Sequence, residues 1–183
     1  MKSLSTITHS KRPLTKKLVI YLFILTLSSS FLSCQSDNEA QDGPQAGVVV
    51  KNFKTYPVKQ LATSSGHLIK AYIAKTNQEQ TQGLSGVKEN QLSDNEGMFF
   101  WYEVAGPRRF WMPNTFTDLD IFFLDKNFKV IHVERGVRAH PGMKVPPEIA
   151  RTPVIYAHHV LELKASSSLA KEIKKGSQLN TVN

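Results

Sequence analysis

Apolar and polar residues alternate over several short stretches of this chain, most regularly at residues 67–76. There Ile69, Ala71 and Ile73 alternate with lysine and tyrosine, which is the two-residue period of a half-buried β-strand. A continuous apolar run at 97–102 lies between a glycine and a Gly-Pro turn, a pattern typical of a buried strand. The chain is therefore predicted to consist largely of short strands.

Further strands are predicted downstream and at the two ends of the domain. The runs at 119–125 and 129–135 are separated by a short loop and predict a β-hairpin. Residues 154–164 predict one long strand, in which successive side chains point to opposite faces. Shorter strands are expected at 48–56, 108–112 and 178–182.

Helices are predicted at only two places. Thr76 and Glu79 have the spacing of a capping box, so a short helix should begin there and end at Gly83. A second short helix should follow Ser168 and end near Gly176. Many short strands with two short helices predict a mostly β fold: a compact single-domain β-sandwich or barrel-like sheet.

The first 47 residues carry a different pattern. Residues 1–33 combine a basic start with an apolar run too short to span a bilayer, which indicates a secretory signal. Cys34 follows directly, and the Phe-Leu-Ser before it resembles the lipobox of bacterial lipoproteins. A lone cysteine in an exported protein has no disulfide partner within the chain, which favours lipidation over plain secretion. Residues 34–47 then predict a flexible polar tether to one folded domain at 48–183.

Charge supports the same division. The 183-residue chain has a formal net charge of +8, from 23 basic and 15 acidic residues. Five basic residues and no acidic ones lie in 1–33, which leaves 18 against 15, or about +3. Because no basic stripe remains, we expect no nucleic-acid partner. We expect an exported protein held by lipid in the cell envelope, at the outer membrane facing the periplasm, since Gln35 rather than Asp follows the cysteine.

The stretch RRFWMPNTFTDLDIFFLD, residues 108–125, places polar side chains directly beside apolar ones. Trp111 is either a core aromatic or an exposed ring that stacks on a sugar or another ring. Asn114 and Thr115 follow a proline, where their side chains commonly close a turn by bonding the backbone. These three residues are candidates for contacts with a ligand.

Asp120 is the first of two candidate acidic groups. It lies in an apolar strand, where a carboxylate is costly unless it is paired or hydrogen-bonded. It either accepts a hydrogen bond from Asn114 or Thr115, or it lines a polar pocket.

Glu162 is the second, and it shares a face of the predicted strand 154–164 with His158. It belongs either to a solvated outer face or to a Glu–His pair suited to acid–base chemistry. His140 lies in a loop rich in proline and glycine, 136–153. A loop of this length on a compact domain is more often functional than idle.

We expect no metal and no cofactor. Adjacent His158 and His159 should point to opposite faces of a strand and would not bind one ion together. The sequence also contains no recognised metal-binding, nucleotide-binding or nucleophile motif. Cys34 lies too far out on the tether to act as a nucleophile in the folded domain.

Five short motifs occur in order along the domain: Gly83-Leu84, GMFF from Gly97, FWMPNT from Phe110, LDIFFLD from Leu119 and VLEL from Val160. Together they resemble the domain of unknown function 192 family, from about residue 48 to the C-terminus. Many members carry arginine where this chain has Gln82 and Val87, and glycine where it has Ala165. The resemblance implies a small β-rich, sandwich-like fold, often in exported proteins, and no established activity.

Functions of different classes remain open. The first is a module that binds a small molecule or an envelope component at a concave edge of the sheet. The second is a hydrolase-like enzyme that uses Asp120 with Glu162 or a histidine, for which the sequence shows no nucleophile. A purely structural envelope protein is the third. The binding module requires the fewest groups, so we expect it; its candidate residues are Trp111, Asn114, Thr115, Asp120, His140 and Glu162.

Overall fold

The computed structural model describes residues 51–182, and this part of the chain forms nine strands and two short α-helices. The predicted signal at 1–33, Cys34 and the tether at 34–47 lie outside the described residues. The strands are β1 (Val58–Ala62), β2 (Leu68–Ala74), β3 (Glu96–Phe100), β4 (Gly106–Arg108), β5 (Leu119–Leu124), β6 (Val130–Val137), β7 (Ile155–Ala157), β8 (His159–Lys164) and β9 (Asn180–Val182). The helices are α1 (Asn77–Gln82) and α2 (Ser168–Glu172).

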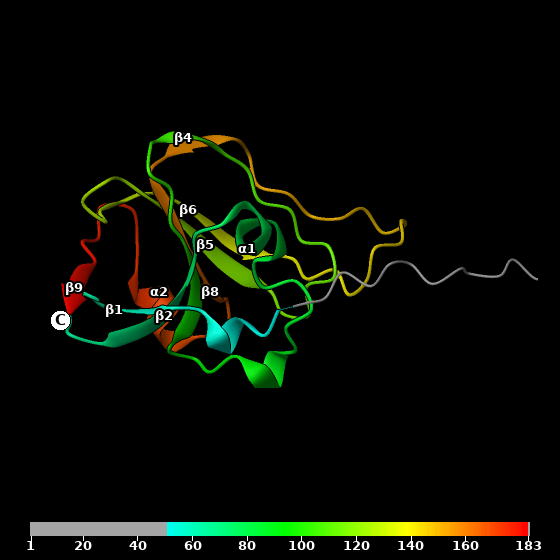
Figure 1. Ribbon diagram of the computed structural model, residues 1–183, viewed down its shortest axis with the longest axis horizontal. Helices are drawn as coiled ribbons and strands as arrows, with labels where there is room; N and C mark the ends of the chain where they lie inside the picture. The colour runs from blue at the N-terminus through cyan, green and yellow to red at the C-terminus, as the bar shows by residue number, and fades with distance from the viewer. Residues whose placement is uncertain (1–50, 183) are drawn as a thin grey trace, which may run out of the picture. The chain divides into compact units, whose positions relative to one another are not determined.

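Seven strands form one mixed sheet in the order β6-β5-β8-β3-β2-β1-β9, and β4 pairs with β7 in a separate ribbon (Figure 1). β2 and β3 run parallel, with α1 in the connection between them, and the other pairs of the large sheet are antiparallel. The predicted mostly β fold with two short helices is confirmed. The sheet is open, with β6 and β9 at its edges, so the barrel-like alternative is wrong.

Each face of the large sheet has its own core, because side chains alternate along the strands. The register pairs Ile121 with Glu162 and Asp120 with Leu163 across β5 and β8, and directly paired residues point to the same face. We call the face of Ile121 and Glu162 the α1 face, and the face of Asp120 and Leu163 the α2 face. The α1 face includes Met98, Phe100, Phe123 and Val160, and the α2 face includes Phe99, Phe122, Leu124 and Leu161.

The two faces are covered in different ways. On the α2 face, Leu169, Ala170 and Ile173 from α2 and the residue after it belong to the core beneath them. On the α1 face, most of the cover comes from segments outside regular secondary structure; its buried residues include Phe53, Leu84, Met112 and Ile149. A helix seals one face, whereas turns and loops cover the other.

Several local predictions are confirmed. The Thr76 hydroxyl accepts from the N–H of Glu79 at 3.2 Å, and the Glu79 carboxylate accepts from the N–H of Thr76 at 3.0 Å. These two bonds are the predicted capping box at the start of α1. Strands β5 and β6 form the predicted antiparallel hairpin.

The prediction of one long strand at 154–164 is wrong. The chain leaves the β4–β7 ribbon after Ala157 and enters the large sheet at His159. Between them His158 lies in neither strand and donates its N–H to the carbonyl of Leu124 at 2.8 Å. Alternation within one strand therefore does not extend across this break.

Two other strand predictions, at 48–56 and at 108–112, are also corrected. Residues Phe53–Thr55, which lie within the strand predicted at 48–56, form a 3₁₀ turn instead. The side chain of its N-cap, Asn52, accepts a hydrogen bond from the N–H of Lys54. Within residues 51–182 the first strand is β1, which begins after Pro57. The strand predicted at 108–112 is also shorter, since β4 ends at Arg108.

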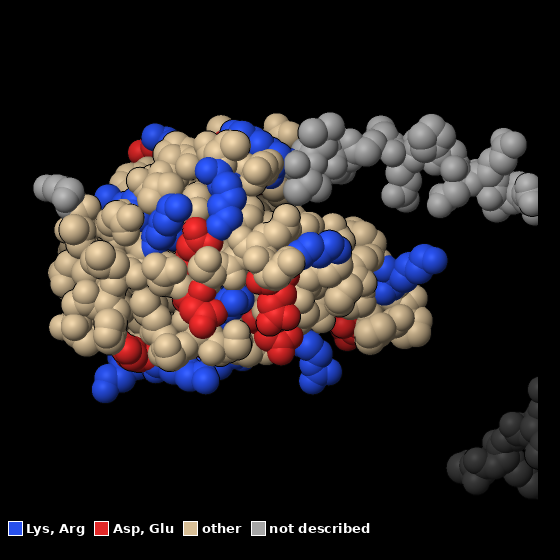
Figure 2. Space-filling view, turned by 90° about the horizontal axis from the view of Figure 1, so that it is seen from below, with Lys and Arg blue, Asp and Glu red and all other residues tan. Residues whose placement is uncertain are grey.

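Charged side chains are mixed on the face of the molecule seen in Figure 2, where Lys and Arg lie among Asp and Glu. Within residues 51–182, no helix has both the length and the apolar character needed to cross a bilayer.

Candidate functional site

Glu162 is a buried carboxylic acid on the α1 face. It is 5% exposed, and its register partners on the neighbouring strands are Met98 and Ile121. Among residues 51–182, none forms a hydrogen bond or an ion pair with its side chain. Burial raises the pKa of Glu162 from 4.5 to about 8. The carboxyl group is therefore mostly protonated at neutral pH.

A cavity of about 40 Å³ lies against Glu162, and we call it the Glu162 pocket. A cavity of this size has room for a few waters or for one small chemical group. Phe110 stands edge-on to Phe100, with ring centroids 4.7 Å apart. The lining consists of residues 80–85, 110–113, Phe100, Thr115, Leu119 and Glu162. Trp111 is 47% exposed, so its indole ring is available to solvent beside the pocket.

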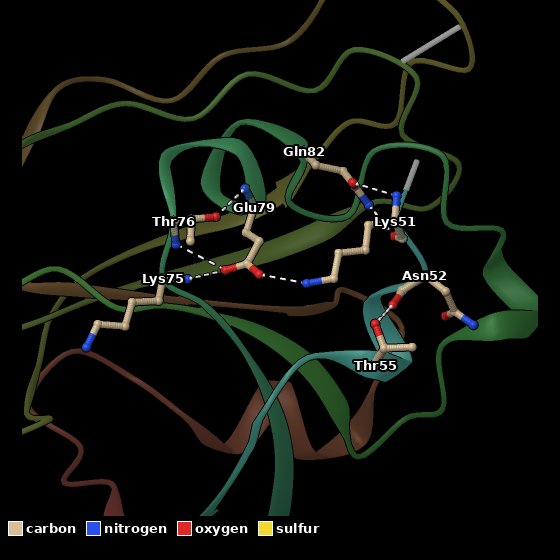
Figure 3. A network of polar contacts seen from close by, with 7 residues as sticks. All are labelled: Lys51, Asn52, Thr55, Lys75, Thr76, Glu79 and Gln82. Carbon is tan, nitrogen blue, oxygen red and sulfur yellow. Dashed lines mark hydrogen bonds and ion pairs between the residues drawn. The ribbon is translucent and has the colours of Figure 1, made fainter. Parts of the chain in front are cut away.

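The network in Figure 3 holds α1, which supplies one wall of the pocket. The Glu79 carboxylate accepts from the N–H of Thr76 and from Lys51 Nζ, each at 3.0 Å. These bonds, that from Thr76 above all, lower the pKa of Glu79 to about 2. The backbone of Lys51 also makes two hydrogen bonds with the side-chain amide of Gln82: its N–H donates to Oε1 at 3.0 Å, and its carbonyl accepts from Nε2 at 2.7 Å. The amide of Gln82 is thereby bonded to the N-terminal segment of the domain, although Gln82 lines the pocket.

Gly83 ends α1 and brings the backbone close to the carboxyl group. Its φ of +49° is a conformation that favours glycine. A Cβ atom at this position would lie 3.1 Å from Phe100 Cζ and 3.8 Å from Glu162 Oε2. The Gly-Leu motif is thus explained by its place in this wall, where a side chain at residue 83 would take up space beside Glu162.

A second wall, residues 110–113, is held by hydrogen bonds to two other segments. The N–H of Met112 donates to the carbonyl of Ala150 at 3.1 Å, and the N–H of Thr152 donates to the carbonyl of Phe110 at 3.0 Å. From the turn after α1, the Ser85 hydroxyl donates to the carbonyl of Pro113 at 3.1 Å. The loop predicted at 136–153 therefore holds this wall in place.

Three of the candidate residues line the pocket together: Trp111, Thr115 and Glu162. The guanidinium carbon of Arg151 lies 5.3 Å from the centroid of the Trp111 ring. The Thr115 hydroxyl donates to the carbonyl of Pro113 at 3.2 Å, which closes the turn as the sequence pattern predicts. Trp111 is a rim residue rather than a core residue.

Asn114 and His140 support this wall from outside the lining. Asn114 has a φ of +50°, which asparagine tolerates, and its N–H donates to the carbonyl of Gly142 at 2.7 Å. His140 is buried, and its Nε2 donates to the carbonyl of Lys144 at 2.9 Å. Asn114 thereby joins residues 110–115 to the loop 136–153, and His140 holds that loop together.

Asp120 lies on the α2 face, away from Glu162 and Trp111. Its carboxylate accepts from Arg135 Nη1 at 2.5 Å and from the N–H of Gly136 at 2.8 Å. Neither Asn114 nor Thr115 donates to it, so that alternative is wrong. A site that uses Asp120 together with Glu162 is also ruled out by this geometry, since the sheet lies between the two side chains.

His158 and His159 do not point to opposite faces as expected. Their ring centroids are 4.5 Å apart, because His158 lies outside β8 and the strand alternation does not apply to it. The His159 ring packs among Trp101, Phe99 and Phe128, at 4.5, 5.3 and 5.3 Å. Burial lowers the pKa of His159 to about 4. Glu162 therefore has no histidine partner from this pair.

The chemistry available in the pocket follows from these facts. A protonated carboxyl group can both donate and accept a hydrogen bond, and an ionised one would attract a cation in a setting of low dielectric constant. A buried acid with a raised pKa in a pocket is a common feature of binding and catalytic sites. The geometry thus defines a small, partly aromatic pocket with one acidic group at its base.

The described residues thus form an open mixed β-sheet in which a buried acid, Glu162, lies against a cavity on a loop-covered face. The DUF192 family, described as uncharacterized ACR, matches residues 60–181, and the chain is a member of that family. None of the curated proteins with which the sequence was compared matches it.

Two solved structures share the fold. One is a protein from Sinorhizobium meliloti 1021 that has been proposed to be a transcription regulator, with a TM-score of 0.55 and 25% identity over 69% of this chain and 95% of the other. The second is a protein of unknown function from Novosphingobium aromaticivorans DSM 12444, with a TM-score of 0.54 and 26% identity over 67% of this chain and 83% of the other.

The sequence did not point to most of the pocket lining. Residues 80–85, Phe100 and Met112 all line the pocket, and none was a candidate. The available signal was Gly83, because a glycine at a helix end marks a backbone conformation that other residues rarely adopt.

Proposed function

We propose that this protein is an envelope lipoprotein whose domain binds a small molecule, or an envelope component, in the Glu162 pocket. The observation that carries the proposal is a carboxyl group only 5% exposed, beside a cavity, with no bonding partner among residues 51–182. Burying a polar group without a partner costs about 1–3 kcal/mol. A bound ligand that supplies the missing hydrogen bond would offset that cost.

The pocket is too small for a whole sugar or peptide, so we infer that it holds one protruding group of a larger molecule. Trp111 lies beside it and is 47% exposed, which suits stacking against the rest of such a molecule. The apolar wall of Phe100 and Phe110 would keep water away from the acid. This arrangement supports recognition better than it supports a structural role.

The alternative function is an enzyme that uses Glu162 as a general acid, and the raised pKa of Glu162 favours it. In the pocket lining, however, the hydroxyls of Ser85 and Thr115 both donate to the carbonyl of Pro113, and that of Thr81 donates to the carbonyl of Asn77. None of the three is directed to Glu162 as a nucleophile would be. Binding therefore accounts for the described residues with fewer unmet requirements.

The test is a thermal-shift screen of the full chain against glucose, N-acetylglucosamine and soluble peptidoglycan fragments. We expect a compound that raises the melting temperature of the wild type and of Glu89→Gln, but not of Glu162→Gln. Glu89 is an exposed carboxylate elsewhere on the surface, so its variant controls for the loss of one charge. Shifts that persist in Glu162→Gln would reject the pocket as the binding site.

The lipid anchor is proposed from the sequence alone, because Cys34 lies outside the described residues. Mass spectrometry of protein extracted from membranes should find a mature N-terminus at Cys34, heavier by its acyl groups. An unmodified chain that begins upstream of Cys34 would contradict the proposal. Fractionation of the envelope would then test the expected place at the outer membrane, facing the periplasm.

A further inference from the structure

We propose that the group held in the Glu162 pocket is a primary ammonium group carried by a larger molecule. This inference rests on the proposed binding function and names the ligand class of the same site. The acid, the charges around it, the aromatic rings and the size of the cavity all bear on it.

The first support is charge. No lysine or arginine is among the residues that line the pocket, and Glu162 is the one ionisable side chain there. A cation is the ligand whose binding would gain most from such a lining, because it would neutralise a carboxylate that nothing else among residues 51–182 pairs.

Other charged groups near this face lie outside the lining. Tyr102 is close enough to Glu162 for the carboxylate to contribute to its raised pKa, after burial as the main cause, and the Arg108 guanidinium stacks 3.5 Å from its ring centroid. On β6, His132 Nε2 and Glu134 Oε1 are hydrogen-bonded at 2.5 Å. Neither pair neutralises Glu162.

The second support is aromatic. Trp111, Phe110 and Phe100 line the pocket, and the faces of aromatic rings attract cations. Arg151 already places a guanidinium group 5.3 Å from the Trp111 centroid, so this ring does accept a cation as a neighbour. Arg151 is exposed, and solvent and salt screen its repulsion of an incoming ammonium ion.

The third support is size. About 40 Å³ accommodates an ammonium group with the carbon next to it, whereas a quaternary ammonium group would need more room than a few waters occupy. Primary amines reach a cell envelope both as free small molecules and as lipid headgroups. Both sources share the same chemistry, and the experiment separates them.

The experiment compares propylammonium chloride with 1-propanol, which has a similar size and no charge, at equal ionic strength and pH 7. We expect propylammonium to raise the melting temperature of the full chain and 1-propanol to leave it unchanged. Titration calorimetry in two buffers of different ionisation enthalpy should show release of nearly one proton per ammonium ion bound, because the protonated acid must ionise. Glu162→Gln should weaken binding at least tenfold, and Glu89→Gln should not.

A second arm replaces propylammonium with butane-1,4-diammonium or with glycerophosphoethanolamine. Tighter binding of the first indicates a free amine, and tighter binding of the second indicates a lipid headgroup. An equal response to 1-propanol, or ammonium binding that persists in Glu162→Gln, would overturn the inference. If neutral sugars bind in a Glu162-dependent way and ammonium does not, the binding function stands and its ammonium ligand is rejected. If no compound binds, both are rejected.

Discussion

Asp120 and Glu162 lie on adjacent strands, are almost equally buried, and have opposite surroundings. Asp120 is 3% exposed and accepts hydrogen bonds from Arg135 and Gly136 on the α2 face. Glu162 is 5% exposed on the α1 face and, within residues 51–182, accepts none. Burial alone therefore does not mark a functional acid. Glu162 differs from Asp120 in that its carboxyl group has no partner among residues 51–182 and lies against a cavity.

Glu96 makes the same point with an identical residue type. Burial raises the pKa of its carboxyl group, but bonds from Lys54, from the Tyr72 hydroxyl and from the N–H of Ser93 outweigh this and lower the pKa to about 2. Glu162 experiences only the effect of burial, and its pKa is raised to about 8. The two glutamates thus differ in their partners, and Glu162 also lies deeper among protein atoms.

The cover of each face explains the difference. Arg135 donates to Asp120 and also to the carbonyls of Ala170 and Ile173 at the end of α2, so one side chain joins the acid to the covering helix. On the α1 face, Lys54 pairs with Glu96, but no cation among residues 51–182 pairs with Glu162. The cover of turns and loops on this face leaves a cavity where such a group would lie.

The largest expected effect is the pH dependence that Glu162 imposes on stability. Its pKa in the folded state is raised from 4.5 to about 8, so between these values the native state holds a proton that the unfolded state has released. The free energy of unfolding must therefore fall as pH rises through this window, by about 4–5 kcal/mol at most. Glu162→Gln should remove this loss and be the more stable protein at pH 8.

His159 opposes this trend at lower pH, which is why a difference between two proteins must be measured. Its pKa is lowered from 6.5 to about 4, so stability falls as pH falls through that range. The two effects offset each other between pH 4.5 and 6.5 in the wild type. Chemical denaturation from pH 4.5 to 8.5 should show the Glu162→Gln variant gaining steadily on the wild type. Parallel curves would show that Glu162 has a partner.

Gly97 tests how tightly the α2 face is packed. A Cβ at this position would collide with the backbone carbonyl of Glu162 and lie 2.5 Å from Leu163 Cδ2. Gly97→Ala should therefore cost about 3 kcal/mol, measured by chemical denaturation. Gly106→Ala is the matched control, since its nearest neighbour would be an ordinary 3.5 Å away, and it should cost less than about 1 kcal/mol. Equal losses would show that the contacts predicted for a Cβ at Gly97 are relieved, and that the α2 face is not tightly packed at this position.

Asp120→Asn should destabilise the protein by about 2 kcal/mol, because it removes charge from the bonds with Arg135 and Gly136. Ligand responses that depend on Glu162 should persist in this variant under conditions where it is folded. Asp94→Asn serves as the control: Asp94 pairs with Lys164 at 2.8 Å but is 69% exposed, so its loss should cost less than about 0.5 kcal/mol. If Asp120→Asn melts like the wild type, the acid has no structural role.

The sequence predicted those parts of the fold that depend on local pattern. The capping box at Thr76, the β5–β6 hairpin and the mostly β class follow from residues close together in the chain. The break at His158 did not follow, because it depends on β7 pairing with β4 while β8 pairs with β5. Both halves of that stretch have strand-like sequences, and only the tertiary pairing separates them.

The site was predicted in part. Trp111, Thr115 and Glu162 were all candidates and do line one pocket. Asp120 was placed with them because alternation assigns a residue to one of two faces without telling which face carries the site. Its partner Arg135 is 15 residues away in sequence and meets it only through the hairpin register. The separation of the two acids is a property of the sheet and could not be deduced from spacing.

The smallest expected effect on stability comes from Trp111, and it contrasts the two tryptophans of the chain. Trp111 is 47% exposed beside the Glu162 pocket, so Trp111→Ala should cost less than about 1 kcal/mol. Trp101 packs toward the α2 face, with its ring 4.5 Å from His159 and 6.2 Å from Phe99, and Trp101→Ala should cost about 2–3 kcal/mol.

Binding should reverse this order of the two tryptophans. Trp111→Ala should weaken any ligand that Glu162 holds, because the ring would stack on the part of the molecule outside the cavity. Trp101→Ala should leave that affinity unchanged wherever the protein remains folded, because the sheet separates Trp101 from the pocket. Denaturation curves and ligand titrations on both variants check the two halves of the prediction together. A Trp111→Ala variant that loses stability as Trp101→Ala does, yet binds normally, would make Trp111 part of the core and leave Glu162 without its aromatic rim.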